Sequence, residues 1–446
     1  MEINFSNAEK VIYGGNEATA VYVGNIKVWG IGNYIPTSQY TEFKVVSANE
    51  NYETVIINSI NGYNTPIVYR NDEEVEPGTF NVIVGDTFKI KGEFSLKETT
   101  ATIEFLSFQT GLISAYEMFC FYKGNIIGGL DKLNASNLTH MGSMFFGCSN
   151  LTSLDLSGWN VSNATNIIYM FYECSSLTEL DLSSWNISSA INSMEGTFCG
   201  CSNLTSLDLS GWDVSNVKNM HGTFKGCSNL TSLDLSNWNT KNITSMQNMF
   251  YGCSNLTSLD LSDWDVSNVT NMIQVFRECS KLTSLDLSNW NTTNLELISN
   301  MFCDCSNLTE LDLSGWDVSK VKTTYSAFSG CSKLTSLNLS GWNISSAINS
   351  VEGTFRSCSN LTSLDLSGWD VSNVTYISYM FYNCSSLTNL DLSGWDTSNV
   401  TEYTSMLRYV PTNCVIKIDP TKFINKSTGI TFTPSELGWN GTFTYI

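Results

Sequence analysis

The sequence is poor in histidine, proline and basic residues, and this scarcity excludes several classes of function. Its 446 residues include 2 histidines and 6 prolines, and 42 acidic residues against 22 basic ones give a net charge of −20. Such a chain repels nucleic acid and anionic membrane surfaces, so neither is an expected partner. The acidic excess predicts either a solubilising surface or a face that attracts cations or basic groups.

Long apolar runs and a secretory signal are also missing. No apolar run approaches the roughly 18 residues of a membrane helix, so we expect no membrane insertion. The first residues, MEINFSNAEKVIYGG, have neither the basic segment nor the apolar segment of a signal peptide. We therefore expect the chain to be made in a cytoplasm and not to be exported by the usual route.

The scarcity of catalytic groups points away from an enzyme. A catalytic nucleophile needs a base beside it, and the two histidines, His140 and His221, have different offsets from the methionines around them. No phosphate-binding, dinucleotide-binding or zinc-protease motif is present. Two Cys-x-Cys pairs, at 199–201 and 303–305, each resemble half of a zinc site, but one cysteine of each pair belongs to a repeat. We therefore expect no enzymatic activity and no resident cofactor.

What the sequence has instead is one motif repeated along most of its length. A tryptophan and a phenylalanine recur in phase with the cysteines, which indicates one supersecondary unit per repeat, stacked into a solenoid. Disulfides between adjacent repeats are conceivable, but a reducing cytoplasm favours free thiols packed as small apolar groups. Ten of the 14 cysteines recur once per repeat, at a nearly constant interval: Cys148, Cys174, Cys201, Cys227, Cys253, Cys279, Cys305, Cys331, Cys358 and Cys384.

Each repeat begins with the pattern of a short strand. In LTSLDLS, which starts at residue 204, Leu207 and Leu209 flank Asp208. This is the alternation of a strand with its leucines inward and its aspartate outward. Parallel strands stack about 4.8 Å apart, so ten repeats would form a sheet roughly 48 Å long.

The rest of the repeat has the spacing of a turn and a helix. Val217, Met220 and Phe224 follow one another at i, i+3 and i+7, the apolar stripe of a helix of about two turns. Asp213 or Ser215 is placed to cap that helix. The sequence thus predicts an α/β repeat solenoid whose coils contain a short parallel strand and a short helix, preceded by small all-β N-terminal modules.

The repeat closely resembles that of a known family. The pattern L-x-x-L-D-L-S-x-W-[DN]-x-S-x-[VA]-T-x-M-x-x-M-F-x-x-C-S-x-L, found over about residues 145–406, is similar to the repeat of BspA-like bacterial surface proteins. The resemblance implies a leucine-rich-repeat fold and, more loosely, adhesion or binding to a host surface. It supplies no catalytic residue.

The composition changes along the chain and predicts five regions. Residues 147–406 form the array of about ten 26-residue coils, with a degenerate capping repeat before it at 111–146 and a C-terminal cap at 407–446. Residues 37–110 contain alternating strand patterns typical of a small β-sandwich-like domain. Residues 1–36 form a β-rich anchoring module, in which VYVGNIKVWG resembles an N-terminal module of tailed-phage structural proteins.

The outward aspartates of LDLS form a column that needs relief from repulsion. At ~4.8 Å and an effective dielectric constant of about 20, neighbouring carboxylates repel by roughly 3 kcal/mol. Hydrogen bonds from serine and threonine, raised pKa values or bound cations could each provide that relief. A carboxylate ladder with a structural role is the first interpretation, and a divalent cation site is the alternative. The candidate cation ligands are Asp208, Asp234, Asp260, Asp286 and Asp312.

Variation between repeats gathers just before the cysteines, whereas the strand segment hardly varies. Tyrosine and arginine, which often anchor interfaces, occur at these varied positions. We therefore expect a specific partner to contact this varied face and the ends of the array, although unselected surface is an open alternative. The candidate partner-binding residues are Tyr169, Lys225, Tyr251, Arg277, Arg356, Tyr379 and Tyr382.

Together these patterns predict a non-enzymatic structural protein of a phage virion, such as a tail or head fibre or adhesin. It would be made in the host cytoplasm, contact other virion proteins through residues 1–36 and bind a host cell-surface protein or glycan. A homo-oligomer is compatible with this role. The first alternative is a bacterial cell-surface adhesin, exported by another route. A glycan depolymerase is the second alternative, but it needs clustered carboxylates that break the repeat.

Overall fold

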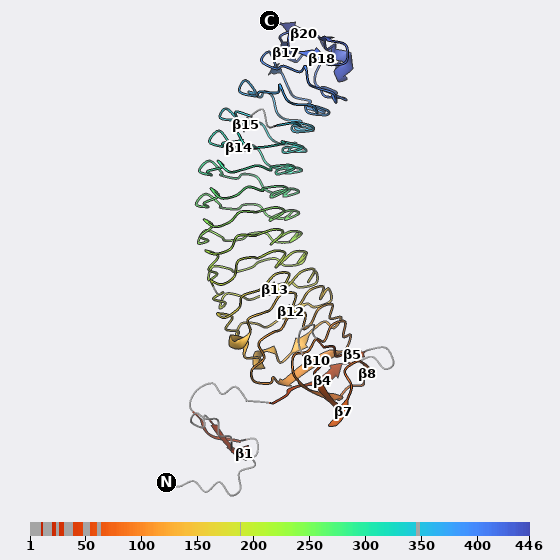
Figure 1. Ribbon diagram of the computed structural model, residues 1–446, viewed down its shortest axis with the longest axis vertical. Coiled ribbons are helices and arrows are strands. Elements are labelled where there is room, and N and C mark those ends of the chain that lie inside the picture. Colours follow the sequence, from red (N-terminus) through yellow and green to blue (C-terminus); the bar gives the residue numbers. More distant parts are fainter. Residues whose placement is uncertain are drawn as a thin grey trace.

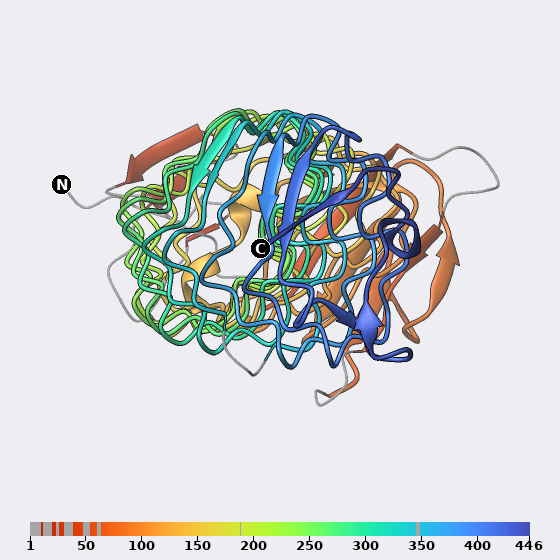
Figure 2. The ribbon, with the colours of Figure 1, turned by 90° about the horizontal axis from the view of Figure 1, so that it is seen from above.

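The protein is an elongated, bowed stack of coils with a β domain at its N-terminal end, as the computed structural model shows (Figure 1). The structure describes residues 39–47, 54–59, 64–187, 189–344 and 348–446, together with the backbone of three short strands before residue 31. Seen from above, the outlines of successive coils overlie one another (Figure 2). The chain therefore forms a β-solenoid, with about 13 turns.

The N-terminal β domain is built from short, mostly antiparallel strands. Its main sheet has the order β11-β10-β4-β9-β6-β7, and β5 pairs with β8 in a second, two-stranded sheet. Phe43, Phe88 and Phe105 are fully buried between these strands. The strands are β4 (Thr41–Ser47), β5 (Thr54–Ile56), β6 (Ile67–Arg70), β7 (Glu73–Val75), β8 (Thr79–Asn81), β9 (Thr87–Lys91), β10 (Thr102–Ser107) and β11 (Ile127–Gly128).

The β domain is continuous with the first coil of the array. Strand β11 lies parallel to β10 at the edge of the sheet. The backbone N–H groups of Leu96 and Glu98 donate to the carbonyls of Met118 and Cys120, at 2.6 and 3.0 Å. One hydrophobic core runs from Phe43 to Phe443. The domain therefore covers the apolar end of the solenoid, which an uncapped array would expose to water.

The expected anchoring module includes three short strands that the structure describes. Strands β1 (Lys10–Val11), β2 (Ala20–Val23) and β3 (Ile26–Gly30) form a small antiparallel sheet. The rest of residues 1–36 lies outside the described residues. The likeness of this segment to a phage module therefore stays a prediction.

The LDLS segments face the core as predicted but pair less continuously than expected. Leu207 and Leu209 are buried and Asp208 is exposed. The parallel strands occur in three groups, whereas in the middle of the array the bonds along this face are long, for example 3.5 Å from Thr257 N to Thr231 O. The expected continuous sheet is thus reduced to short pairs: β12 (Ser153–Leu154) with β13 (Glu179–Leu180), β14 (Glu310–Asp312) with β15 (Ser336–Asn338), and β16 (Asn389–Asp391) with β17 (Val415–Ile418) and β20 (Phe443–Tyr445).

The predicted helix of each coil is wrong. The only helices among the described residues are three short 3₁₀ helices, η1 (Leu130–Lys132), η2 (Ala135–Asn137) and η3 (Pro434–Leu437). Where the helix was expected, each coil contains three overlapping β-turns. In one coil these turns close when Thr223 N donates to Met220 O, Lys225 N to Gly222 O and Cys227 N to Phe224 O, at 3.1–3.3 Å.

The amide groups between those donors bond to the next coil instead of to their own. Met220, Gly222, Phe224 and Gly226 donate to carbonyls of the following coil, at 2.7–3.0 Å. An α-helix would keep these bonds within one coil, because each of its N–H groups bonds to a carbonyl one turn back. The apolar spacing that suggests a helix is therefore met by consecutive turns, which we call the turn ribbon.

Positive φ angles make the turn ribbon possible. Two residues of each coil have left-handed backbone: the fifth residue before the ladder cysteine and the residue directly before it. In the coil of Cys227 they are Gly222 (φ 59°) and Gly226 (φ 74°). A positive φ at the third residue of a turn is the signature of type II turns. With no helix to cap, Asp213 instead accepts the N–H of Ser215 at 3.0 Å and closes a local turn.

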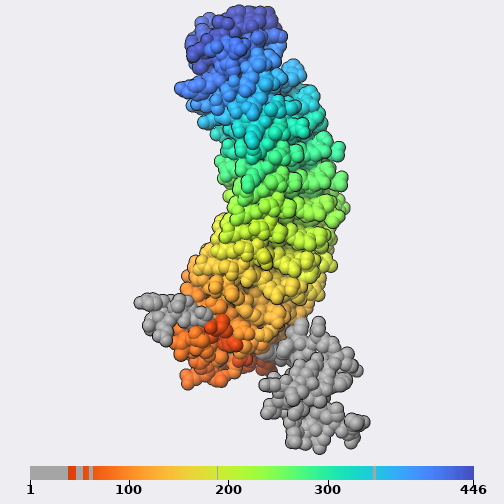
Figure 3. Space-filling view, turned by 180° about the vertical axis from the view of Figure 1, so that it is seen from behind, coloured from red at the N-terminus to blue at the C-terminus, as the bar shows by residue number. Residues whose placement is uncertain are grey.

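The large side chains stack from coil to coil inside the array. Phenylalanine neighbours on the turn-ribbon side have ring centroids 5.4–5.8 Å apart, whereas stacked tryptophans are 5.9–6.5 Å apart. The coils are thus closer on the turn-ribbon side, and the array bends toward it. Figure 3 shows the coils as parallel ridges along this bow.

The C-terminal residues continue the array and close it. Strands β17 and β20 extend the parallel pairing beyond β16, and Trp439 is buried, with its indole N–H donating to Pro411 O at 3.2 Å. Strands β18 (Ile424–Asn425) and β19 (Ile430–Thr431) form a hairpin. Helix η3 begins with a capping box between Thr433 and Glu436.

We predict that Gly222→Ala destabilises the protein by about 1–2 kcal/mol, because alanine resists the left-handed backbone at this position. In a helix the same change would stabilise by about 1 kcal/mol. Denaturant unfolding, followed by circular dichroism, gives the sign directly. Gly158→Ala is the matched control, since Gly158 has ordinary backbone and open space around it, and it should change stability little.

Candidate functional site

The exposed aspartate column is held by serine residues of its own repeat. Asp234 accepts the backbone N–H of Ser236 at 3.1 Å and its hydroxyl at 2.7 Å. Along the column, the serine N–H lies 2.9–3.2 Å from the aspartate Oδ1. Every carboxylate thus has a local partner.

These hydrogen bonds decide how the column relieves its repulsion. They hold the pKa of each candidate cation ligand below its ordinary value, and repulsion from neighbouring aspartates only partly opposes them. The expectation that raised pKa values relieve the repulsion is therefore wrong for these five aspartates. No group of three or more histidine, cysteine or acidic side chains suited to a metal ion occurs in the described part of the chain.

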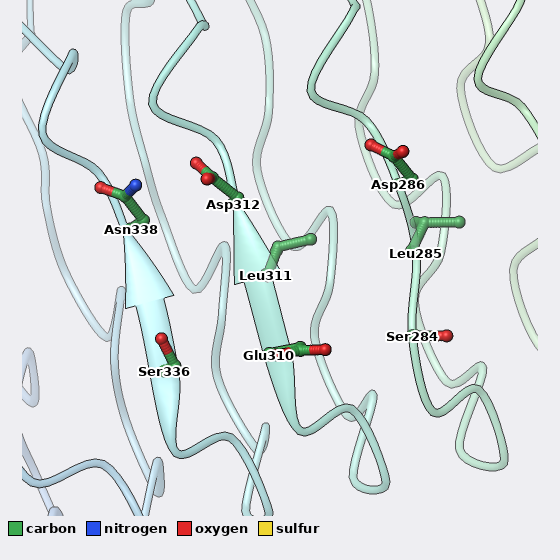
Figure 4. Close-up of a pocket in the computed structure, with 8 residues that line it drawn as sticks. All are labelled: Ser284, Leu285, Asp286, Glu310, Leu311, Asp312, Ser336 and Asn338. Atoms are coloured by element: carbon green, nitrogen blue, oxygen red, sulfur yellow. The ribbon is translucent and has the colours of Figure 1, made fainter.

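One shallow groove of about 410 Å³ lies on the strand face across β14 and β15. Figure 4 shows Asp286, Asp312 and Asn338 in one row, with Ser284, Glu310 and Ser336 in a second row. Glu310 stands where most other repeats have serine, so it adds a carboxylate beside the aspartate column here. Such a groove can accept hydrogen bonds from hydroxyl or amino groups. It presents neither a histidine nor a cysteine among its lining residues.

A second column of side chains, which we call the outer column, lies along the turn ribbon. We define it as the residue two positions before each ladder cysteine, or before Val410 in the last coil. The backbone carbonyls of this column accept N–H groups from the preceding coil, for example Gly226 N to Tyr251 O at 2.7 Å. These bonds set successive side chains in register. The column reads Phe146, Tyr172, Cys199, Lys225, Tyr251, Arg277, Cys303, Ser329, Arg356, Tyr382 and Arg408.

Tyr169, the candidate partner residue nearest the N-terminus, lies in an aromatic cluster. Tyr172 stacks on Phe146 with ring centroids 4.6 Å apart, and Tyr169 meets Tyr172 edge to face. The hydroxyl of Tyr169 donates to Glu195, and burial, followed by this carboxylate, raises the pKa of Tyr169 to about 12. Tyr169 is therefore committed to contacts within the array.

The middle candidates form a sandwich. Lys225 Nζ lies 5.3 Å from the ring centroid of Tyr251, and the Arg277 guanidinium carbon lies 5.2 Å from it. Lys225, Tyr251 and Arg277 are each half-buried. Arg277 also pairs with Glu278, its Nε 3.2 Å from the carboxylate.

The remaining candidates gather in a third cluster. The guanidinium of Arg356 lies 5.4 Å from the ring of Tyr382 and 5.5 Å from that of Tyr379. Tyr382 in turn meets Tyr409 at 5.3 Å, with Arg408 4.9 Å from the Tyr409 ring. The seven candidates are thus brought together as three clusters along one ribbon.

Sequence reasoning missed five members of these clusters: Phe146, Glu195, Glu278, Arg408 and Tyr409. Phe146 has the same offset from Cys148 as Tyr172 from Cys174, so the repeat frame could have found it. Arg408 and Tyr409 escaped because their coil has Val410 in place of a ladder cysteine. Only the fold shows that this last coil continues the outer column.

The cysteines and histidines do not form a further site. All 14 cysteines are buried free thiols, as predicted, and burial raises the pKa of Cys199 to about 11 and of Cys303 to about 12. His140 is half-buried, bonded through Nε2 to Asn166 at 3.1 Å, and burial lowers its pKa. No helix among the described residues is long and apolar enough to span a membrane.

Comparison with known protein families supports the repeat family. A family model described as "Mycoplasma protein of unknown function, DUF285" matches residues 113–233, 190–310, 218–342 and 298–415, and so covers more than half of the chain. No curated protein matches the chain.

Similar solved structures are solenoids of the leucine-rich-repeat kind. They include TLR13 in complex with ssRNA13 (20% identity, TM-score 0.25, 64% of this chain and 49% of that one). The functional domain of InlJ from Listeria monocytogenes, which includes a cysteine ladder, has 15% identity and a TM-score of 0.20, over 74% of this chain and 69% of that one. The Toll–Spatzle complex of Drosophila has 15% identity and a TM-score of 0.25, over 76% of this chain and 46% of that one. The chain spans about half the length of the first and third. Scores this low say nothing about ligands or partners.

We predict that Ser236→Ala raises the pKa of Asp234 toward its ordinary value, because the serine hydroxyl is the largest cause of its depression. Carboxyl titration by NMR measures the shift. The folded-state pKa lies below the unfolded value of about 3.9, so these bonds stabilise the fold above that pH. Their stabilisation is lost as the pH falls through the folded-state pKa. Ser288→Ala, two coils away, should leave Asp234 unchanged, and an unchanged Asp234 in Ser236→Ala would contradict the assignment.

Proposed function

The chain belongs to the DUF285 family, and from this premise we propose that it is a non-enzymatic binding protein. Its leucine-rich-repeat array presents the turn ribbon to a host-surface or partner ligand. The contrast between its two faces carries this proposal. The strand face repeats the same serine-bonded aspartates, whereas the outer column changes from coil to coil and gathers tyrosine with lysine or arginine.

A binding role suits the chemistry of the turn ribbon. Tyrosine and arginine contribute large contact areas and directional bonds, and they dominate the energetics of many interfaces. Stacking between coils holds these side chains in place before a ligand arrives, which lowers the entropy lost on binding. The ribbon also lies on the inner side of the bow, where an extended ligand can touch several coils.

The depolymerase alternative finds less support in the groove at β14 and β15. Glycoside hydrolysis uses a general acid whose pKa is raised, paired with a second carboxylate. The groove's Asp286 and Asp312 have lowered pKa values because serine residues donate to them. These two carboxylates are suited to remain ionised and not to donate a proton.

We propose a phage virion as the setting, with the chain acting as a tail or head fibre or adhesin. The support is the likeness of VYVGNIKVWG, within residues 1–36, to N-terminal modules of tailed-phage structural proteins. In this proposal residues 1–36 contact other virion proteins. The alternative setting is a bacterial cell surface, which the BspA-like repeat would fit equally well.

The turn-ribbon proposal predicts a face-specific loss of attachment. Replacing Tyr251, Arg277 and Tyr382 together by alanine should weaken attachment to the host or partner while lowering the melting temperature by only a few degrees, since each cation–π contact contributes about 0.5–1 kcal/mol. Cell-binding assays and thermal melts measure both effects. The matched variant replaces Asp234, Asp260 and Asp286 by alanine. Attachment that survives the first change and is lost in the second would place recognition on the strand face.

The virion proposal predicts a separable anchor. Deleting residues 1–36 should leave the solenoid folded, because the described core begins at Phe43, yet abolish incorporation into particles. Circular dichroism checks the fold, and immunoblots of purified particles check incorporation. Normal incorporation of the deletion variant would contradict the virion-anchor role and leave the bacterial-surface setting.

A further inference from the structure

The outer column contains the same three-coil pattern twice. A cation, a tyrosine and a second cation follow one another in consecutive coils as Lys225, Tyr251 and Arg277, and again as Arg356, Tyr382 and Arg408. In the first cluster both cations lie 5.2–5.3 Å from the tyrosine ring. In the second, Arg356 lies 5.4 Å from Tyr382, and Arg408 reaches it through Tyr409. Two similar cation–tyrosine clusters thus lie along the same turn ribbon.

The second cluster is not a copy of the first by duplication. The near-identical segments at 185–201 and 342–358 lie six coils apart, whereas each member of the second cluster follows its counterpart by five coils. A shift of six coils would place Tyr382 opposite Lys225 instead of opposite Tyr251. The pattern therefore arose at two places independently of that duplication.

The clusters concentrate positive charge on an acidic protein. Within the described part of the chain, no carboxylate lies within ion-pair distance of Lys225, Arg356 or Arg408, and only Arg277 has one, from the adjacent Glu278. Arg356 and Arg408 are exposed, and Lys225 and Arg277 are half-buried. A cation that lies over a tyrosine ring keeps its charge, and each of these four cations is at least partly exposed to solvent. The ribbon therefore offers two anchors for anions.

The space between the clusters favours an extended ligand. Five coils separate equivalent members, a distance of roughly 24 Å at ~4.8 Å per coil. Between the two clusters the outer column has only the small side chains of Cys303 and Ser329. A ligand that engages both anchors must therefore be long, and it must carry anions at repeated intervals.

From this geometry we propose that the turn ribbon binds an acidic polysaccharide, one chain of which spans both cation–tyrosine clusters. The inference rests on the proposed binding function and specifies its ligand. A polymer of identical acidic sugars presents carboxylates or sulfates at regular intervals, so one chain can satisfy two similar clusters. The surface of a folded protein that is not built from repeats has no such repetition. The tyrosine hydroxyls and the cations of both clusters also suit a ligand that is rich in both hydroxyls and acids.

Polygalacturonate is a suitable probe, with dextran as the neutral control and poly-glutamate as the acidic peptide control. We expect calorimetric binding of polygalacturonate that weakens with added salt. Lys225→Gln with Arg277→Gln should weaken it at least tenfold, and so should Arg356→Gln with Arg408→Gln, because two linked anchors bind far more tightly than one. Oligomers too short to span both clusters should lose only about half of their binding in either variant, because the other cluster remains.

A matched variant distinguishes the effect of the two clusters from the effect of the protein's overall charge. Lys241→Gln with Lys281→Gln removes two exposed cations that lie off the outer column, and it should change the affinity less than twofold. Equal losses in the matched and cluster variants would overturn the proposal, as would poly-glutamate binding as tight as that of polygalacturonate.

Attachment assays on the same variants separate the ligand from the function. Lost attachment in the cluster variants together with no polygalacturonate binding by the native protein would overturn the polysaccharide ligand and leave the turn-ribbon function intact. Unchanged attachment together with no polygalacturonate binding would overturn both. Attachment and polysaccharide binding lost together would support both.

Discussion

The structure depends on the hydrogen bonds that the turn ribbon makes between coils. Alternate amide groups of each ribbon close turns within their own coil, while those between them bond to the next coil at 2.6–3.0 Å in most cases. Most ribbon amides among the described residues therefore have a protein partner, even where the strand face pairs poorly. This close ladder fixes the spacing of the phenylalanines, draws the coils together on one side and produces the bow.

Buried polar side chains complete the same scheme. The thiol of each ladder cysteine lies 3.0–3.2 Å from a phenylalanine carbonyl of the preceding coil. Most ladder tryptophans donate their indole N–H to a leucine carbonyl in the same way, as Trp290 does to Leu261 at 3.0 Å. Cysteine and tryptophan are thus apolar fillers that also supply a donor, which accounts for their fixed phase in the repeat.

The two outer surfaces follow from this scaffold in different ways. On the strand face each repeat supplies its own solution to charge repulsion, a serine two positions after the aspartate, so every coil can be alike. On the turn ribbon the side chain two positions before the cysteine lies outside the hydrophobic core, and where it is large it mainly contacts the equivalent side chains of neighbouring coils. Residue types there are free to differ between coils, and the same freedom allows two cation–tyrosine clusters to form where the chain requires them.

The sequence by itself determined the solenoid, the inward leucines, tryptophans and phenylalanines, and the buried free thiols, because a constant repeat phase leaves one way to bury so many apolar side chains. It also located the varied positions that contain Tyr251, Arg277 and Tyr382. Only the tertiary structure decided that Val217, Met220 and Phe224 lie on consecutive turns and not on a helix. Their spacing fits both, and the choice is made by hydrogen bonds to carbonyls of the next coil. Contacts between coils likewise decided that Lys225 and Arg277 enclose Tyr251 and that Tyr382 meets Tyr409, since these residues are a whole coil apart in the chain.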